Sequence, residues 1–209
     1  MTIYHEKIKE LKENHTIVDF AKFSINEKSI VLRIADTSNE TIELLTDWRN
    51  KFWDAFPVKF QATFEGTKKW LLEQVYNKSD RILFIIFLDG GKIGHIGTYR
   101  YDPIQNSAEI DNVLRSIREN TPGLMEKITN YLIYWMLHDL SLSKVRLKVF
   151  SDNFKAINLY ERCGMLTVGI IPLKRIFTND GWEWQETKLN EGEYADRYFS
   201  IMEITHISN

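Results

Sequence analysis

The chain has 209 residues, a formal net charge of −2 and 44% hydrophobic residues. This length suits one domain with a sizeable core, and the charge balance argues against a nucleic-acid-binding protein, which usually carries a basic excess. Cys163 is the single cysteine, which excludes an intrachain disulfide and a cysteine metal cluster and favours a reducing, cytoplasmic location.

Residues 1–28 are expected to form an N-terminal extension, followed by one domain over residues 29–209. The first residues are polar and lack the apolar core of a signal peptide, and no apolar run in the chain approaches the length of a membrane span. Tyr4–Lys12 has the pattern of a short helix, and Thr16–Ile25 alternates loosely, which favours an extra edge strand or a partner contact.

The first half of the domain predicts a strand, two helices and an aromatic segment between the helices. Ser29–Ala35 alternates as a strand, and apolar residues recur at the helical period within Thr41–Phe52 and Thr67–Tyr76. Phe52–Phe64 carries five aromatic residues and one proline. Such a cluster either closes a core or lines a pocket whose flat apolar walls bind rings.

Three strands are predicted next. Arg81–Leu88 is an almost continuous apolar run, typical of a strand buried on both faces. A turn at residues 89–91 leads to Lys92–Tyr101, where His95 lies between apolar residues and is expected in the core or sheet face rather than in catalysis. Ser107–Leu114 follows, with Glu109 and Asp111 on one face of the strand.

A loop and a helix come after these strands. Arg115–Met125 contains two arginines and Gly123, and Thr121-Pro122 has the composition of a helix N-cap followed by proline at the first helical position. Gly123–Asp139 carries an apolar stripe at helical spacing, which we interpret as core.

The stretch Lys144–Met165 joins a strand to a short helix. Lys144–Phe150 alternates as a strand, Asp152 or Asn153 is a natural N-cap, and Gly164 is a helix stop signal. Asn153, Ala156 and Tyr160 share one helix face, an arrangement suited to an extended ligand.

The C-terminal part is predicted as two strands around a polar segment. Met165–Phe177 and Arg197–Thr205 are the strands, and Gly169 and Pro172 allow a bend in the first. Asn179–Asp196 is acidic and contains Trp182 and Trp184. It is either a solvated hairpin or a wall whose carboxylates attract a cationic amine.

The run D-N-x-x-A-I-x-x-Y-x-x-x-G-M at residues 152–165 resembles the signature of the GNAT superfamily of acetyl-CoA-dependent N-acetyltransferases. Two further segments, Trp48–Asn50 and Ala108–Val113, are similar to one branch of it, near ribosomal-protein N-terminal acetyltransferases and bacterial amino-sugar acetyltransferases. Arg118–Gly123 resembles the pyrophosphate loop of the superfamily. The resemblance implies an α/β fold of the α+β type, with a mixed, mostly antiparallel central sheet flanked by helices. It also implies that Ser107–Leu114 splays from its neighbouring strand to admit the pantetheine arm.

The resemblance also implies roles for individual residues. Tyr160 protonates the leaving thiolate, and Glu109 or Asp111 serves as general base, unless these carboxylates are only structural. Acetyl-CoA, with no metal, is held by residues of the central strand, the phosphate loop and the signature helix: Asn112, Val113, Leu114, Arg118, Thr121, Gly123, Leu124, Asn153, Ala156 and Tyr160. Trp48, Arg49 and Asn50 lie on the acceptor side, unless they serve the core and the solvated surface.

The phosphate loop departs from the family pattern, because Thr121 replaces the first glycine and Pro122 removes an amide donor. The expected acceptor is a small primary amine such as a nucleotide-linked amino sugar. The alternatives are a protein or peptide N-terminus, or a non-catalytic acyl-CoA- or partner-binding module with the same fold. A homodimer is also expected.

Overall fold

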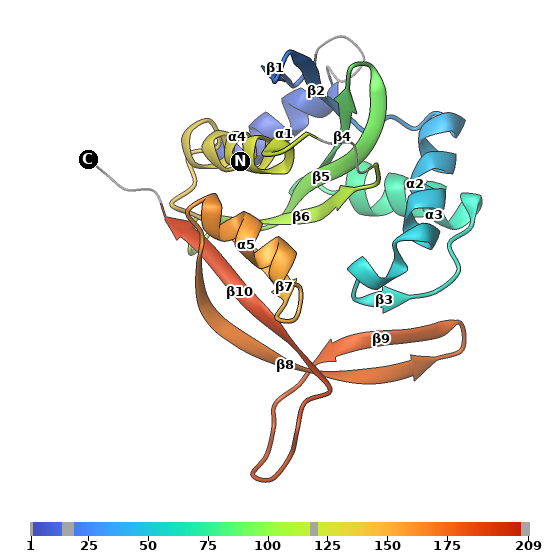
Figure 1. Ribbon diagram of the computed structural model, residues 1–209, viewed down its shortest axis with the longest axis vertical. Coiled ribbons are helices and arrows are strands. Elements are labelled where there is room, and N and C mark those ends of the chain that lie inside the picture. Colours follow the sequence, from blue (N-terminus) through green and yellow to red (C-terminus); the bar gives the residue numbers. More distant parts are fainter. Residues whose placement is uncertain (1, 14–18, 118–120, 206–209) are drawn as a thin grey trace.

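The computed structural model describes residues 2–13, 19–117 and 121–205, and within them ten strands form one mixed sheet (Figure 1). The strand order is β1-β2-β4-β5-β6-β7-β10-β8-β9-β3. Of these neighbours, β6 and β7 pair in parallel and the others pair antiparallel. The predicted mixed, mostly antiparallel α/β architecture is therefore confirmed.

The predicted elements occur in the predicted order, and two further strands, Val58–Lys59 and Gly181–Glu186, are added to them. The helices are α1 (Ile3–Glu13), α2 (Asn39–Lys51), α3 (Phe64–Trp70), α4 (Leu124–His138) and α5 (Phe154–Arg162), with a 3-10 turn η1 (Trp53–Ala55) and a π-helical turn η2 (Leu71–Tyr76). The strands are β1 (Ala21–Ile25), β2 (Lys28–Ile34), β3 (Val58–Lys59), β4 (Ile82–Leu88), β5 (Gly91–Asp102), β6 (Ser107–Arg115), β7 (Lys144–Phe150), β8 (Leu166–Thr178), β9 (Gly181–Glu186) and β10 (Arg197–Thr205).

Helices cover both faces of the central strands. In Figure 1, α1 and α4 lie on one side of the sheet, and α2 and α3 lie on the other. Strand β4 shows the consequence, because Phe84 packs in the core beneath α1 and α4, whereas Leu83 and Ile85 pack in the core beneath α2 and η2. This two-sided burial explains the continuous apolar run of β4.

The N-terminal segment packs against the rest of the domain. Tyr4 and Ile8 of α1 are buried in the main core, and the Tyr4 hydroxyl donates a 3.0 Å hydrogen bond to the carbonyl of Asp80. Strand β1 is an edge strand antiparallel to β2. An edge strand was one of the two interpretations of the alternating pattern in Thr16–Ile25. The extension boundary at residue 28 stays a prediction, and the structure has residues 25 and 28 paired across the β1–β2 hairpin.

The N-caps of α3 and α4 explain why these two helices begin at other residues than predicted. Helix α3 begins at Phe64, because the Thr63 side chain caps it by accepting a 3.1 Å hydrogen bond from Gly66 N. The Thr121-Pro122 cap was wrong, since α4 begins at Leu124 with Gly123 as its N-cap at φ 74°. Glycine adopts this left-handed conformation without a side-chain clash, so Thr121 and Pro122 stay in the preceding loop.

The acidic C-terminal segment begins as the second strand of a hairpin, and this strand also joins the segment after α2. Strand β8 turns into β9, and β9 also pairs with the short strand β3 through Val58 with Glu183 and Lys59 with Trp182. The Trp184 amide donates a further 2.8 Å hydrogen bond to the carbonyl of Pro57. In Figure 1 the β8–β9 hairpin reaches across the lower end of the molecule to β3, so the segment after α2 and the C-terminal hairpin meet.

Candidate active site

The site lies where β6 and β7 separate. Their parallel pairing covers only Ser107–Glu109 with Lys144–Arg146, and the strands diverge beyond it, as expected. Strand β6 also has a bulge against β5. Asp111 pairs with Gly97, and Leu114 pairs with His95. Between these pairs β6 has two residues, Asn112 and Val113, and β5 has one. Asn112 has a left-handed backbone at φ 51°. The bulge and the divergence together open the sheet.

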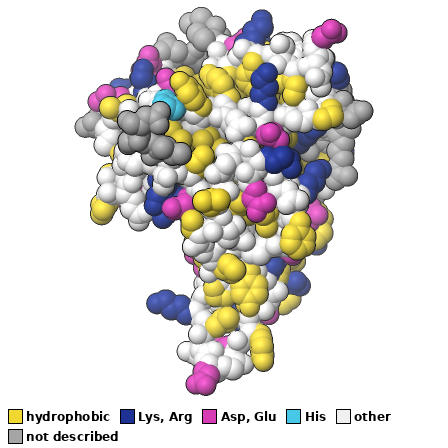
Figure 2. Space-filling model, turned by 60° about the vertical axis from the view of Figure 1, so that its left-hand side comes forward, with side chains coloured by type: hydrophobic (Ala, Val, Ile, Leu, Met, Phe, Trp, Pro, Cys, Tyr) yellow, Lys and Arg dark blue, Asp and Glu magenta, His cyan; other side chains and the backbone are white. Residues whose placement is uncertain are grey.

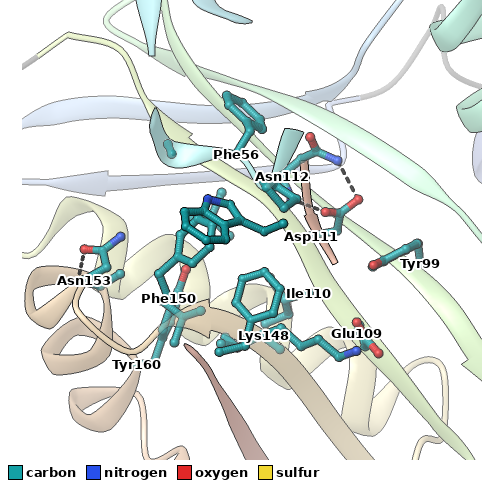
Figure 3. Close-up of a pocket in the computed structure, with 18 of the residues that line it drawn as sticks. Phe56, Tyr99, Glu109, Ile110, Asp111, Asn112, Lys148, Phe150, Asn153 and Tyr160 are labelled. Carbon is teal, nitrogen blue, oxygen red and sulfur yellow. Dashed lines mark hydrogen bonds between the residues drawn. The ribbon is translucent and has the colours of Figure 1, made fainter. Parts of the chain in front are cut away.

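A cavity of about 300 Å³ occupies this opening (Figure 3). We call it the carboxylate cavity, because Glu109, Asp111 and Glu186 line it. Two cations, Arg100 and Lys148, and aliphatic residues also line it, together with six aromatic side chains: Phe56, Tyr99, Phe150, Tyr160, Trp184 and Phe199. In Figure 3, Asn153 and Tyr160 lie on the side of α5, and Glu109 and Tyr99 lie on the opposite side. Carboxylates among aromatic walls are suited to a cationic or hydrogen-bonding organic molecule.

The two carboxylates on β6 have different partners. Asp111 forms a 2.5 Å ion pair with Arg81 and accepts hydrogen bonds from the backbone and side chain of Asn112. Glu109 lies 3.7 Å from the Arg100 guanidinium, which is beyond hydrogen-bond length. Burial raises the pKa of Glu109, against the lowering effects of Arg100 and Lys148. Glu109 is therefore the better placed of the two to accept a proton.

A second cavity, of about 540 Å³, lies between the α4 N-terminus and α5. We call it the loop cavity; Thr121, Pro122, Gly123 and Leu124 line it. Three cationic side chains, Arg115, Lys155 and Arg162, also line it. Amide groups at a helix N-terminus and nearby cations favour phosphate. The hydroxyl of Thr121 is buried and has no hydrogen-bond partner among the described residues, and Arg118 lies outside them.

Helix α5 provides the wall that both cavities share. Asn153, Ala156 and Tyr160 line both cavities, and Val113 of the β6 bulge faces them as well. Asn153, one of the two predicted candidates, is the N-cap, and its side-chain oxygen accepts a 3.2 Å hydrogen bond from Ala156 N. Tyr160 is 6% exposed, and burial raises the pKa of its phenol above the usual value. The phenol is therefore protonated at neutral pH and can act as an acid.

The Trp48-Arg49-Asn50 triplet lies behind the cavities and lines neither of them. Trp48 is buried in the core beneath α2. Arg49 donates to the carbonyl of Val58 and stacks over Phe56 with 4.2 Å from Cζ to the ring centroid, and burial lowers its pKa to about 10. The triplet is therefore placed to support the segment after α2, and direct contact with a substrate stays a prediction.

Asn50 holds the same segment. Its amide donates to the carbonyl of Ala62 over 3.0 Å and accepts from Ala62 N over 2.8 Å. Leu114, predicted beside the cofactor, is also buried in the core and lines neither cavity. His95 is buried under the bulge, and burial lowers its pKa to about 4, which agrees with its expected place in the sheet.

Sequence reasoning missed several lining residues. Phe56 and Trp184 belong to segments for which a pocket wall was one of two interpretations. Glu186 belongs to the acidic segment, for which a carboxylate wall was likewise one of two interpretations. Lys148 and Phe150 were not identified; Lys148 and Glu186 form a 2.5 Å ion pair across the strands. Lys155 and Arg162 lie on α5 among the signature residues, four and three residues from Leu159, which also lines the loop cavity. Two cations at this spacing were an available signal.

The described residues contain no group of three or more His, Cys, Asp or Glu side chains that could hold a metal ion. Within the same residues, no helix combines the length and the apolar character that a membrane crossing requires.

A family model described as an acetyltransferase (GNAT) domain matches residues 30–166. The chain therefore belongs to the GNAT acetyltransferases, enzymes that use acetyl-CoA. A search of curated proteins gives no match.

Solved structures with the same fold include spermidine N-acetyltransferases from Vibrio cholerae. One, in complex with CoA and spermine, has a TM-score of 0.62 and 18% identity, and the alignment covers 84% of this chain and 95% of that one. A chimera of that enzyme with hSSAT has a TM-score of 0.64, 18% identity and the same coverage. A dodecameric form of the enzyme has a TM-score of 0.61, with 18% identity and coverage of 84% and 93%. At these identities the similarity establishes the fold.

Proposed function

We propose that the protein transfers the acetyl group of acetyl-CoA directly to the primary amine of a small molecule. The observation that carries this proposal is the buried phenol of Tyr160 in the wall shared by two cavities of different chemistry. The loop cavity is suited to phosphates and the carboxylate cavity is suited to an amine. The phenol of Tyr160, in the wall between the two cavities, can therefore act on the thioester bond that breaks where acetyl-CoA meets the amine.

The loop cavity fits CoA in spite of Thr121 and Pro122. The amides that begin α4, together with Lys155 and Arg162, would hold the phosphates, and Asn153 and Ala156 would border the pantetheine arm. The unpartnered hydroxyl of Thr121 supplies a polar group that the family's glycine lacks. Acetyl-CoA supplies an acetyl thioester that an uncharged amine can attack.

The residues of the chain have three tasks in the proposed reaction. Glu109 accepts the proton of the ammonium group, because its raised pKa makes it a stronger base than an ordinary carboxylate. Backbone amides near Asn112–Leu114 stabilise the negative charge that develops on the carbonyl oxygen. Tyr160 donates its proton to the departing sulfur. Asp111, paired with Arg81, orients the bulge and serves as the alternative base.

The acceptor is proposed to be an amino sugar or a similar ring-bearing amine, as in the branch that the sequence resembles. Phe56, Phe150 and Trp184 support this choice, because aromatic faces bind sugar rings. A peptide N-terminus is less well supported, since the β3–β9 pairing joins two walls of the cavity. A polyamine is the second candidate, favoured by the carboxylates that line the cavity and by the similarity to spermidine N-acetyltransferases.

Calorimetry with acetyl-CoA and dephospho-CoA is the first test, followed by mass spectrometry of glucosamine, spermidine and a peptide incubated with acetyl-CoA. Micromolar binding, worth about 8 kcal/mol, and a mass increase of one acetyl group are expected. Binding without any product would favour the non-catalytic module. No binding at millimolar acetyl-CoA would reject the proposed use of the loop cavity.

A homodimer is also proposed. Leu166, Val168 and Ile170 alternate along the outer face of β8 with exposures of 70%, 52% and 63%. Figure 2 shows hydrophobic side chains gathered over the lower part of the molecule, where β8 and β9 lie. Apolar patches of this kind on a protein surface mark interaction sites. Sedimentation of the protein and of Val168→Glu tests this: a dimer that dissociates in the variant is expected, and a monomer in both would reject it.

A further inference from the structure

Arg100 has an unusual backbone conformation. Tyr99 pairs with Glu109 and Asp102 pairs with Ser107, so β5 contains one extra residue and forms a bulge. Arg100 lies in this bulge with φ 54°. Glycine adopts such a conformation freely, whereas another residue there costs about 1 kcal/mol or more. Strain of this kind persists at residues whose side chain has a function.

The bulge turns the Arg100 side chain toward the candidate base. Its guanidinium carbon lies 4.8 Å from the centroid of the Tyr99 ring, and its nearest nitrogen lies 3.7 Å from Glu109. The guanidinium donates no hydrogen bond to the described part of the chain, and the side chain is 54% exposed. Its planar set of five N–H donors matches the oxygens of a carboxylate or phosphate.

A third cavity, of about 450 Å³, begins at the same place. Arg100 and Glu109 line both it and the carboxylate cavity, so the two are continuous at this pair. Arg146 contributes a second guanidinium to the third cavity, oriented by a 3.1 Å hydrogen bond to Glu203. The Asp102 carboxylate there accepts hydrogen bonds from the amides of Ile104 and Gln105. Beyond Glu109, two guanidinium groups therefore face the cavity.

We infer that the acceptor is an amine that also carries an anionic group, a carboxylate or a phosphate, and that Arg100 binds this group while Glu109 faces the amine. This inference rests on the proposed function and narrows its substrate class. A polyamine, which carries no anion, would gain nothing from Arg100. The opposite charges of Arg100 and Glu109 instead match the two ends of a zwitterionic ligand.

Calorimetry with matched pairs of amines tests the inference. The pairs are glucosamine with glucosamine 6-phosphate, and phenethylamine with phenylalanine, titrated into the protein with and without CoA. The anionic member of at least one pair is expected to bind at least tenfold more tightly, and both Arg100→Gly and Arg100→Gln are expected to remove this preference. The first pair reports a phosphate and the second a carboxylate.

Arg100→Gly also controls for folding. Relief of the left-handed strain is expected to keep or raise its stability against urea, so a lost preference cannot come from an unfolded chain. Arg33→Gln, on the distant strand β2, is the matched control and should keep the preference. Equal affinity within both pairs, no binding by either anionic amine at millimolar concentration, or a preference that survives in either Arg100 variant would overturn the inference.

Different results would reject the proposed acetyl transfer and the proposed role of Arg100. Acetylation of the amines that lack an anion, without any preference for the anionic partners, would keep the acetyl transfer and reject the role of Arg100. Binding of the anionic amines through Arg100 without acetyl-CoA binding would reject the acetyl transfer and keep the anion site.

Discussion

His95 donates a 2.6 Å hydrogen bond from Nδ1 to the backbone carbonyl of Asn112. The donor must be the ring nitrogen, because a carbonyl oxygen only accepts. Asn112 is the residue at which β6 enters its bulge, and the tilted Trp48 ring lies 5.8 Å from the His95 ring. A side chain of β5 therefore fixes the strand that opens the site, and α2 packs behind it.

Substitution of His95 is expected to impair the site through the bulge. His95→Ala leaves the Asn112 carbonyl unpaired, which costs about 1–3 kcal/mol of stability, and should raise the KM for acetyl-CoA and lower kcat about tenfold. His95→Asn keeps a donor near the position of Nδ1 and should restore most of the stability and most of the activity. Steady-state kinetics and urea unfolding of the two variants measure this. Equal kinetic defects in both would show that the hydrogen bond is not what matters.

Stability should fall as the pH is lowered past the ordinary pKa of histidine. His95 has a pKa of about 4 in the folded state and about 6.5 in the unfolded state. Between these values the unfolded chain binds more protons, so about 3 kcal/mol of unfolding free energy is lost from pH 6.5 to pH 4. Urea unfolding at several pH values should show a shallower loss for His95→Asn. Parallel curves would contradict this origin of the pH dependence.

Removal of the Tyr160 hydroxyl should affect the chemical step. In Tyr160→Phe the buried ring still packs, so acetyl-CoA affinity by calorimetry should change less than about threefold, whereas kcat should fall about 100-fold or more. Tyr134→Phe, which removes an exposed phenol from α4, is the control and should behave as the unmodified protein. An unchanged kcat in Tyr160→Phe would exclude the phenol as general acid.

The two carboxylates of β6 should separate into a base and a structural partner. Glu109→Gln should lower kcat/KM about 100-fold and remove the limb of the pH profile on which the rate rises with pH as Glu109 deprotonates. Asp111→Asn leaves Arg81 without its ion partner. The side chains of Arg81 and Asp111 are mostly buried, at 17% and 24% exposure. The Asp111→Asn substitution should therefore lower the free energy of unfolding in urea by about 1–2 kcal/mol. The reverse pattern would make Asp111 the base.

The predictions from the sequence were most accurate for features that depend on residues close together in the chain. The signature helix needs only its cap at Asn153 and the spacing to Tyr160, both of which are local. The walls of the carboxylate cavity depend on segments that are distant in the chain, since Trp184 reaches Phe56 only because β9 pairs with β3. No local pattern specifies that pairing.

The sequence also did not predict the backbone conformation of single residues. The left-handed residues Arg100 and Gly123 decide where a guanidinium points and where α4 begins. A threonine and a proline before Gly123 resemble an ordinary cap, and only the geometry of the loop distinguishes the two possibilities.

The two-residue pairing of β3 with β9 also bears on the order of folding. Strands β6 and β7 with helices α4 and α5 form one continuous stretch of chain, so all of the loop cavity except the wall made by Phe52 and Ala55 can assemble from near neighbours. The β3–β9 pairing joins segments far apart in the sequence through few hydrogen bonds, and such contacts form late because closing a long loop is entropically costly. During folding, the half of the site that binds the cofactor is therefore expected to form before the half that recognises the acceptor.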